Sequence, residues 1–170
     1  EADKDYVAMG LTGVGTKEAM ELREKLLKQG ANKDDVVLSL AGVGTKESME
    51  LREKLLEQGK EYYVAYGLAG VGTEEAMELR EKLLEQGADK NSVALSLAGV
   101  GTKEAMELRE KLLEPGGADW NSVALSLAGV GTEEAMELRE RLLKKGSSKD
   151  YIAWGLAGVG TKEAMELREK

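Results

Sequence analysis

The sequence predicts an all-α fold, an α-solenoid in which stacked helical hairpins build a right-handed superhelix. Two observations predict it: the tetrapeptide Gly-Val-Gly-Thr recurs about every 29 residues, and apolar residues follow a helical period around each copy. The copies begin at Gly13, Gly42, Gly70, Gly99, Gly129 and Gly158. We therefore expect a single repeat domain over residues 1–170, with six repeats at approximately 3–30, 32–59, 60–87, 89–116, 118–146 and 148–170.

Each repeat is expected to open with a short helix, typified by residues 34–41. An Asp, Asn or Ser near its start can accept hydrogen bonds from the free N–H groups of the first turn. The first Gly of the tetrapeptide can end it. Val36 and Leu40 are four residues apart and share one helix face, which we expect to turn towards the core.

The longer helix of each repeat is expected to begin at the Thr of the tetrapeptide. In the first repeat the Thr16 hydroxyl can cap the helix, and Gly30 can end it. Ala19, Leu22 and Leu26 are spaced three and four residues apart, so they form an apolar stripe opposite a face of Glu and Lys. Because neither helix can bury its apolar stripe alone, neighbouring repeats must stack.

Two linked positions in the short helix vary between repeats. Tyr at the first is always followed by Gly four residues later, and a smaller residue at the first is followed by Ser. The pairs are Tyr6/Gly10, Asp35/Ser39, Tyr63/Gly67, Ser92/Ser96, Ser122/Ser126 and Tyr151/Gly155. Since residues four apart share a helix face, we expect Gly to provide space for the Tyr ring.

All five Tyr and both Trp lie in the short helices or at their entry. One interpretation is that the rings fill gaps between stacked repeats, and the sequence favours this one. The other is a partly aromatic binding face, because aromatic residues often anchor interfaces and solenoids bind along extended surfaces. The candidate residues for such a face are Tyr6, Tyr63, Tyr66, Trp120, Tyr151 and Trp154.

One arginine recurs beside the apolar stripe of every long helix. The six residues are Arg23, Arg52, Arg80, Arg109, Arg139 and Arg168, and none has an acidic residue three or four positions away. The favoured interpretation is an aliphatic stem over the core, with the guanidinium reaching a neighbouring repeat's carboxylate or helix-end carbonyl. The alternative is a row of arginines that binds an anionic ligand, which the adjacent glutamates disfavour.

Composition argues against catalysis and against most charged partners. The chain has no His and no Cys, so imidazole and thiol chemistry are excluded, and its paired carboxylates lie beside Lys on the predicted exposed face. Gly-Val-Gly-Thr-Lys lacks the Gly-Lys-Ser/Thr order of a phosphate-binding loop. The net charge of −8 disfavours nucleic acid. We expect no enzyme, no catalytic residue, no cofactor and no metal.

Neither a membrane-length apolar run nor a signal peptide is evident, so we expect a soluble chain, expressed inside the cell, without a membrane partner. The array opens with an ordinary short helix and stops within the sixth long one. We therefore expect apolar side chains to be exposed at both end faces, and head-to-tail stacking or a symmetric dimer to cover them. The candidate self-association residues are Val7, Met9, Leu11, Ala164, Met165 and Leu167.

The two-helix repeat resembles the hairpins of HEAT and tetratricopeptide α-solenoids. Residues 36–49, Val-Val-Leu-Ser-Leu-Ala-Gly-Val-Gly-Thr-Lys-Glu-Ser-Met, also resemble the repeats of transcription-activator-like effectors. That second resemblance implies that the turn, here Gly42 and Val43, contacts a DNA base. However, the turn is Gly-Val in all six repeats, Glu replaces the family's Gln after Lys, and the net charge is negative.

Near-identity of the repeats, regular capping, Glu/Lys pairing and the absence of Cys are typical of a designed or consensus-like repeat protein. The sequence therefore predicts first a non-enzymatic structural scaffold that associates with itself as a homo-oligomer, for example a dimer. A solenoid that binds a protein or peptide is the alternative. A nucleic-acid-binding repeat protein is a third, less favoured one.

Overall fold

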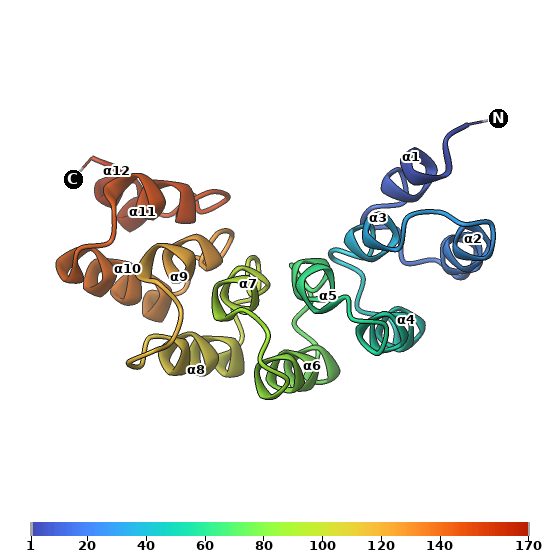
Figure 1. Ribbon diagram of the computed structural model, residues 1–170. Coiled ribbons are helices and arrows are strands. Elements are labelled where there is room, and N and C mark those ends of the chain that lie inside the picture. The colour runs from blue at the N-terminus through green and yellow to red at the C-terminus, as the bar shows by residue number, and fades with distance from the viewer. Residues whose placement is uncertain (1, 170) are drawn as a thin grey trace. The chain divides into compact units, whose positions relative to one another are not determined.

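The computed structural model describes residues 2–169, and these residues form twelve α-helices and no strand (Figure 1). The prediction of an all-α fold is confirmed. The chain divides into two compact halves, Glu1–Ala88 and Asp89–Lys170. In each half, three pairs of helices follow one another, and the second helix of a pair is at least as long as the first. Every repeat therefore contributes one helical hairpin.

The helices of the N-terminal half are α1 (Lys4–Met9), α2 (Lys17–Lys28), α3 (Lys33–Leu38), α4 (Lys46–Leu56), α5 (Glu61–Gly67) and α6 (Glu74–Glu85). Those of the C-terminal half are α7 (Lys90–Leu95), α8 (Lys103–Leu112), α9 (Trp120–Ser126), α10 (Glu133–Lys145), α11 (Lys149–Gly155) and α12 (Lys162–Arg168). In the first half α1, α3 and α5 lie side by side, and in the second α7, α9 and α11 do so (Figure 1).

The predicted caps of the long helices are confirmed. Thr16 Oγ1 accepts a hydrogen bond from the Ala19 N–H at 3.3 Å, and the equivalent Thr caps every other long helix in the same way. Gly30, which follows α2, has a φ of +85°, a backbone conformation that favours glycine. Local chemistry therefore determines where these helices begin and end.

The short helices end earlier than predicted. In the second repeat α3 ends at Leu38 rather than at Ala41, and the next residues form tighter turns, such as Leu40 N–H to Val37 C=O at 3.0 Å. The carbonyl groups of Ser39 and Leu40 accept hydrogen bonds from arginine side chains instead of continuing the helix. The chain then reverses at Gly42, with a φ of +76°.

Successive repeats are joined by backbone hydrogen bonds between their turns as well as by apolar packing. The N–H of Gly42 donates to the carbonyl of Ala69 at 2.8 Å, and in the C-terminal half Gly129 donates to Ala157 at 2.7 Å. The core inside these turns is made of fully buried Leu and Val side chains, for example Val36 and Leu40. The turns at Gly42, Gly99 and Gly129 are therefore each held in register by the turn of the following repeat in the same half.

Candidate functional site

The residues that join the repeats most directly are the arginines of the long helices. Arg109 is fully buried, and its guanidinium donates to three backbone carbonyls. Two belong to the turn of its own repeat, Leu97 at 2.7 Å and Val100 at 2.9 Å. The third, Ser126 at 2.6 Å, ends the short helix of the next repeat. One side chain thus connects three segments of two repeats.

The same arrangement recurs around the other buried arginines. Arg23, Arg52 and Arg139 each donate to two carbonyls of the preceding turn and to one carbonyl of the next repeat. The acceptors are Leu11, Val14 and Ser39 for Arg23, Leu40, Val43 and Gly67 for Arg52, and Leu127, Val130 and Gly155 for Arg139. Arg80 donates to Leu68 and Val71. The carbonyl form of the favoured sequence interpretation is therefore confirmed.

Burial also changes the pKa of the arginine guanidinium groups. Burial, together with the smaller effect of a neighbouring arginine, lowers the pKa of Arg52, Arg109 and Arg139 to about 10. At pH 7 the three guanidiniums remain charged, because that pH lies well below a pKa of about 10. The dipoles of the backbone carbonyls that accept their hydrogen bonds stabilise these buried positive charges. A soluble anion has no access to these fully buried groups, so the interpretation as an anion-binding row is wrong.

The Ser and Gly types of short helix differ in how they meet the preceding repeat. Ser39 Oγ and Ser126 Oγ accept the Nε–H of Arg23 and Arg109, both at 2.9 Å. Where the position is Gly, the Nε of the arginine is buried without a partner, as in Arg52 and Arg139. The Ser type therefore satisfies one more buried donor than the Gly type.

Where the position is Gly, the short helix instead lies closer to the short helix of the preceding repeat. A Cβ on Gly67 would lie 2.6 Å from the carbonyl oxygen of Val37 in the preceding short helix. On Gly10, at the end of the first short helix of the described residues, a Cβ would meet only the carbonyl oxygens of Tyr6 and Val7, at 3.4 Å. The expectation that Gly makes room for the Tyr ring is thus wrong, because the neighbouring helix backbone is what requires the space.

Replacing Ser126 by Ala is expected to lower the free energy of unfolding by about 1–2 kcal/mol, since it leaves the buried Nε–H of Arg109 without an acceptor. Urea unfolding of the purified variant measures the change. Ser148, which is half-buried and caps α11, provides a contrast in burial. An unfolding free energy equal to that of the parent would show that the Ser126 hydroxyl does not stabilise the junction.

The six candidate aromatic residues are all at least partly accessible to solvent. Tyr6 is 79% and Trp154 64% exposed, Trp120 is also exposed, and Tyr63, Tyr66 and Tyr151 are half-buried. Four of them, Tyr63, Tyr66, Tyr151 and Trp154, lie in local aromatic clusters. On α5 the ring of Tyr62 contacts the rings of both Tyr63 and Tyr66, and on α11 the centroids of Tyr151 and Trp154 are 5.7 Å apart.

Tyr62 is a residue that the sequence interpretation missed. It is exposed, and its ring centroid lies 5.2 Å from that of Tyr63 and 4.8 Å from that of Tyr66. The signal available in the sequence was its position, which holds Asp or Asn in the other repeats. Because an aromatic ring replaces a small polar side chain here, the surface at this position of α5 is more apolar than at the same position of the other short helices.

The candidate self-association residues differ in their exposure to solvent. Met9 and Met165 are exposed, and Val7 and Leu11 are half-buried. Ala164 and Leu167 are buried, so the expectation that they are exposed is wrong. Both are buried although no helix follows α12 among the described residues, so the two positions face inward from the long helix. Their counterparts in the fifth repeat are buried too. The counterparts are Ala135 and Leu138.

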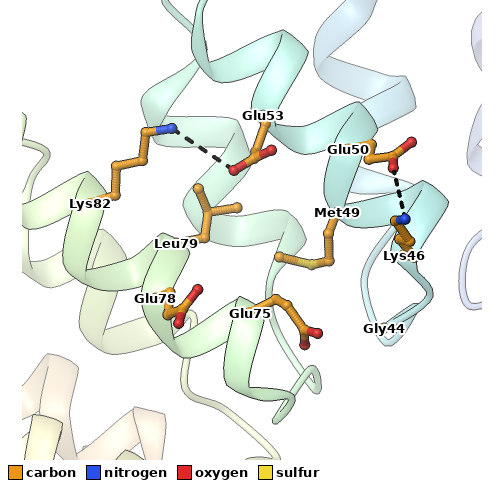
Figure 2. Close-up of a pocket in the computed structure, with 9 residues that line it drawn as sticks. All are labelled: Gly44, Lys46, Met49, Glu50, Glu53, Glu75, Glu78, Leu79 and Lys82. Atoms are coloured by element: carbon orange, nitrogen blue, oxygen red, sulfur yellow. Dashed lines mark ion pairs between the residues drawn. The ribbon is translucent and has the colours of Figure 1, made fainter.

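A groove of about 420 Å³ lies between α4 and α6 (Figure 2). Met49 and Leu79 lie between the helices, and the rim is charged, with four glutamates and two lysines: Glu50, Glu53, Glu75, Glu78, Lys46 and Lys82. The ion pairs Lys46–Glu50 and Lys82–Glu53 are both 3.9 Å long and largely solvated. The excess of carboxylates disfavours an anionic ligand at this face.

The turn that the resemblance to transcription-activator-like effectors assigns to DNA is engaged within the protein. Val43 is buried, and the N–H of Gly42 is bonded to Ala69. A base contact by Val43 is therefore incompatible with its position. A comparison with known protein families gives no matching family model, and a comparison with curated proteins gives no match.

Within residues 2–169 no helix has the length and apolar character that crossing a membrane requires. In the same range there is also no group of three or more Asp or Glu side chains placed to hold a metal ion. Three structural features recur in every repeat: the Thr cap of the long helix, the Gly-Val turn and the arginine of the long helix.

Proposed function

We propose that this chain is a non-enzymatic structural scaffold, an α-solenoid of designed or consensus-like sequence that associates with itself. The observation that carries the proposal is the buried arginine, which donates to carbonyls of its own repeat and of the next one, as Arg109 does. Arg23, Arg52, Arg109 and Arg139 thus each make a polar contact with the next repeat, and this contact is specific for a repeat of the same kind. An array built on such a contact is suited to extension by further copies.

The structural roles of the residues that recur in every repeat support the proposed scaffold function. The Thr of each tetrapeptide caps a helix, its Val is buried in five of the six repeats, and its first Gly reverses the chain. Positions that recur in every repeat are thus occupied with folding and stacking. An enzyme, in contrast, needs a small set of residues whose environments differ from those of their neighbours.

Light scattering on a sizing column, over a wide range of protein concentration, tests the self-association. We expect a molar mass that rises with concentration towards multiples of 18.3 kDa. A mass that stays at 18.3 kDa over the whole range, up to millimolar protein, would contradict the proposal that the scaffold associates with itself.

A second candidate function, binding of a protein or peptide, is supported by the exposed aromatic residues. Tyr62 on α5 and Trp154 on α11 present ring surface to solvent although the chain has few aromatic residues. Arrays of synthetic peptides test it. Peptides that bind the parent chain should lose binding when Tyr62 and Trp154 are replaced by Ala, and an array without any bound peptide would exclude the candidate within the sampled sequences.

A further inference from the structure

The groove between α4 and α6 has an apolar floor beneath charged walls. Its volume is about 420 Å³, and Met49 and Leu79 lie between the two helices (Figure 2). Glu75 and Glu78 of α6 are exposed and line one side of it. An apolar floor next to carboxylates fits a side chain that has an aliphatic stem and a positively charged end. Among the amino acids, Lys and Arg have that character.

The carboxylates in this groove differ in whether the protein itself supplies a cation to them. Glu53 of α4 has a partner in Lys82, 3.9 Å away. For Glu75 and Glu78 of α6, residues 2–169 provide no ion pair. Because the chain also has a net charge of −8, a cation beside these two carboxylates is favoured. The electrostatics of the groove therefore select a positive occupant.

A difference between the repeats explains why Glu78 is unpaired. In four of the six repeats the Thr cap is followed by a Lys, which pairs with the Glu four residues later, as Lys46 does with Glu50 at 3.9 Å. The other three pairs are Lys17–Glu21, Lys103–Glu107 and Lys162–Glu166. In the third repeat the residue after the Thr is Glu74, so Glu78 has a like charge in place of that Lys.

A second set of the same residues lies on α8 and α10. In the fifth repeat Glu133 follows the Thr cap, so Glu137 also has no Lys four residues before it. An ion pair between Arg141 of α10 and Glu110 of α8 joins the two helices. The other counterparts are Met106, Glu107, Glu134 and Leu138. The arrangement thus occurs once in each compact half of the chain.

We propose that the groove between α4 and α6, and equally the matching residues of α8 and α10, bind an Arg or Lys side chain from a basic segment of another protein. In the first groove the aliphatic stem lies on Met49 and Leu79, and the charged end pairs with Glu75 and Glu78. This inference goes beyond the proposed self-association and does not depend on it.

Two double variants with the same change in net charge test the proposal. Glu74→Lys/Glu133→Lys restores, in the third and fifth repeats, the Lys that pairs with the following Glu elsewhere, so the groove loses its unpaired carboxylate. Glu85→Lys/Glu114→Lys is the matched control, because both residues are exposed and lie at the other end of their long helices. Lys28 and Lys144 already occupy the control position in other repeats. Circular dichroism verifies that both variants keep the helix content of the parent.

Fluorescence anisotropy of fluorescein-labelled hexa-arginine at low ionic strength measures the binding, with hexa-citrulline as an uncharged probe of similar shape. We expect the parent to bind hexa-arginine and not hexa-citrulline. The Kd should rise by about fivefold or more in the groove variant and by less than about twofold in the control. Equal weakening in the two double variants would show that net charge alone attracts the peptide and would overturn the proposal, as would a parent that does not bind hexa-arginine.

The methyl resonances of the methionines locate the bound peptide. We expect hexa-arginine to shift the ε-methyl resonance of Met49 and to leave that of Met20 unchanged. Met20 is the equivalent residue of α2, and on the facing helix α4 the carboxylate of Glu50 is already paired with Lys46. Binding that shifts both resonances equally, or neither, would overturn the assignment to the groove. Neither result affects the self-association, which is measured without peptide.

Discussion

Arg109→Ala is expected to lower the free energy of unfolding by about 3–5 kcal/mol, a loss of the size seen when one partner of a buried charged group is removed. The carbonyls of Leu97, Val100 and Ser126 lose a charged donor, and the volume of a fully buried side chain is left empty. Because two of these carbonyls belong to one repeat and the third to the next, the loss weakens the junction itself.

Arg168→Ala is the matched control, because the residue occupies the same helix position but is exposed and donates to one carbonyl. Its unfolding free energy is expected to stay within about 1 kcal/mol of the parent. Urea unfolding at low micromolar protein, where association contributes least, measures both variants. Equal effects of the two substitutions would show that burial between repeats does not determine the contribution of the arginine.

Gly67→Ala is expected to lower the free energy of unfolding by about 1–3 kcal/mol, the usual range for overpacking a core. The new Cβ would lie 2.6 Å from the carbonyl oxygen of Val37 and 3.1 Å from one of its methyl groups. A backbone oxygen cannot rotate away as a flexible side chain can, so α3 and α5 must move apart. That movement also lengthens the hydrogen bond from Arg52 to the carbonyl of Gly67.

Gly10→Ala is the control for this substitution. Its Cβ meets carbonyl oxygens of α1 at 3.4 Å, an ordinary contact, and its backbone is right-handed helical. We expect an unfolding free energy within about 0.5 kcal/mol of the parent or above it, because Ala loses less backbone entropy than Gly. The melting temperatures of the two variants compare them directly. A Gly67→Ala variant as stable as Gly10→Ala would contradict the close approach of α3 and α5.

The sequence was sufficient for those features that depend on neighbours along the chain. Thr16 caps α2, and Gly30 follows its end, because both functions are set within one turn of the helix. The period of the apolar residues likewise predicted an all-α fold with one hairpin per repeat. Spacing also placed the arginines beside the apolar stripe and identified helix-end carbonyls as one of their two possible partners.

Features that depend on another repeat could be predicted only in part. The sequence offered a carboxylate or a carbonyl as the partner of Arg52, and only the fold brings Gly67, fifteen positions away, within 2.7 Å of it. The pairing of Tyr with Gly suggested contact along one helix, whereas Gly67 faces Val37 of a different helix. Ala164 and Leu167 were assigned to an exposed end because helical spacing does not tell which side of a stripe faces inward.

The most direct test of the central claim, that buried arginines join successive repeats, is nuclear magnetic resonance of the guanidinium N–H groups and their exchange with solvent. Arg23, Arg52, Arg80, Arg109 and Arg139 are fully buried, whereas Arg141 and Arg168 are exposed. We expect slow exchange for the five buried residues and fast exchange for the two exposed ones in the monomer. Equally fast exchange for all seven arginines would contradict the claim.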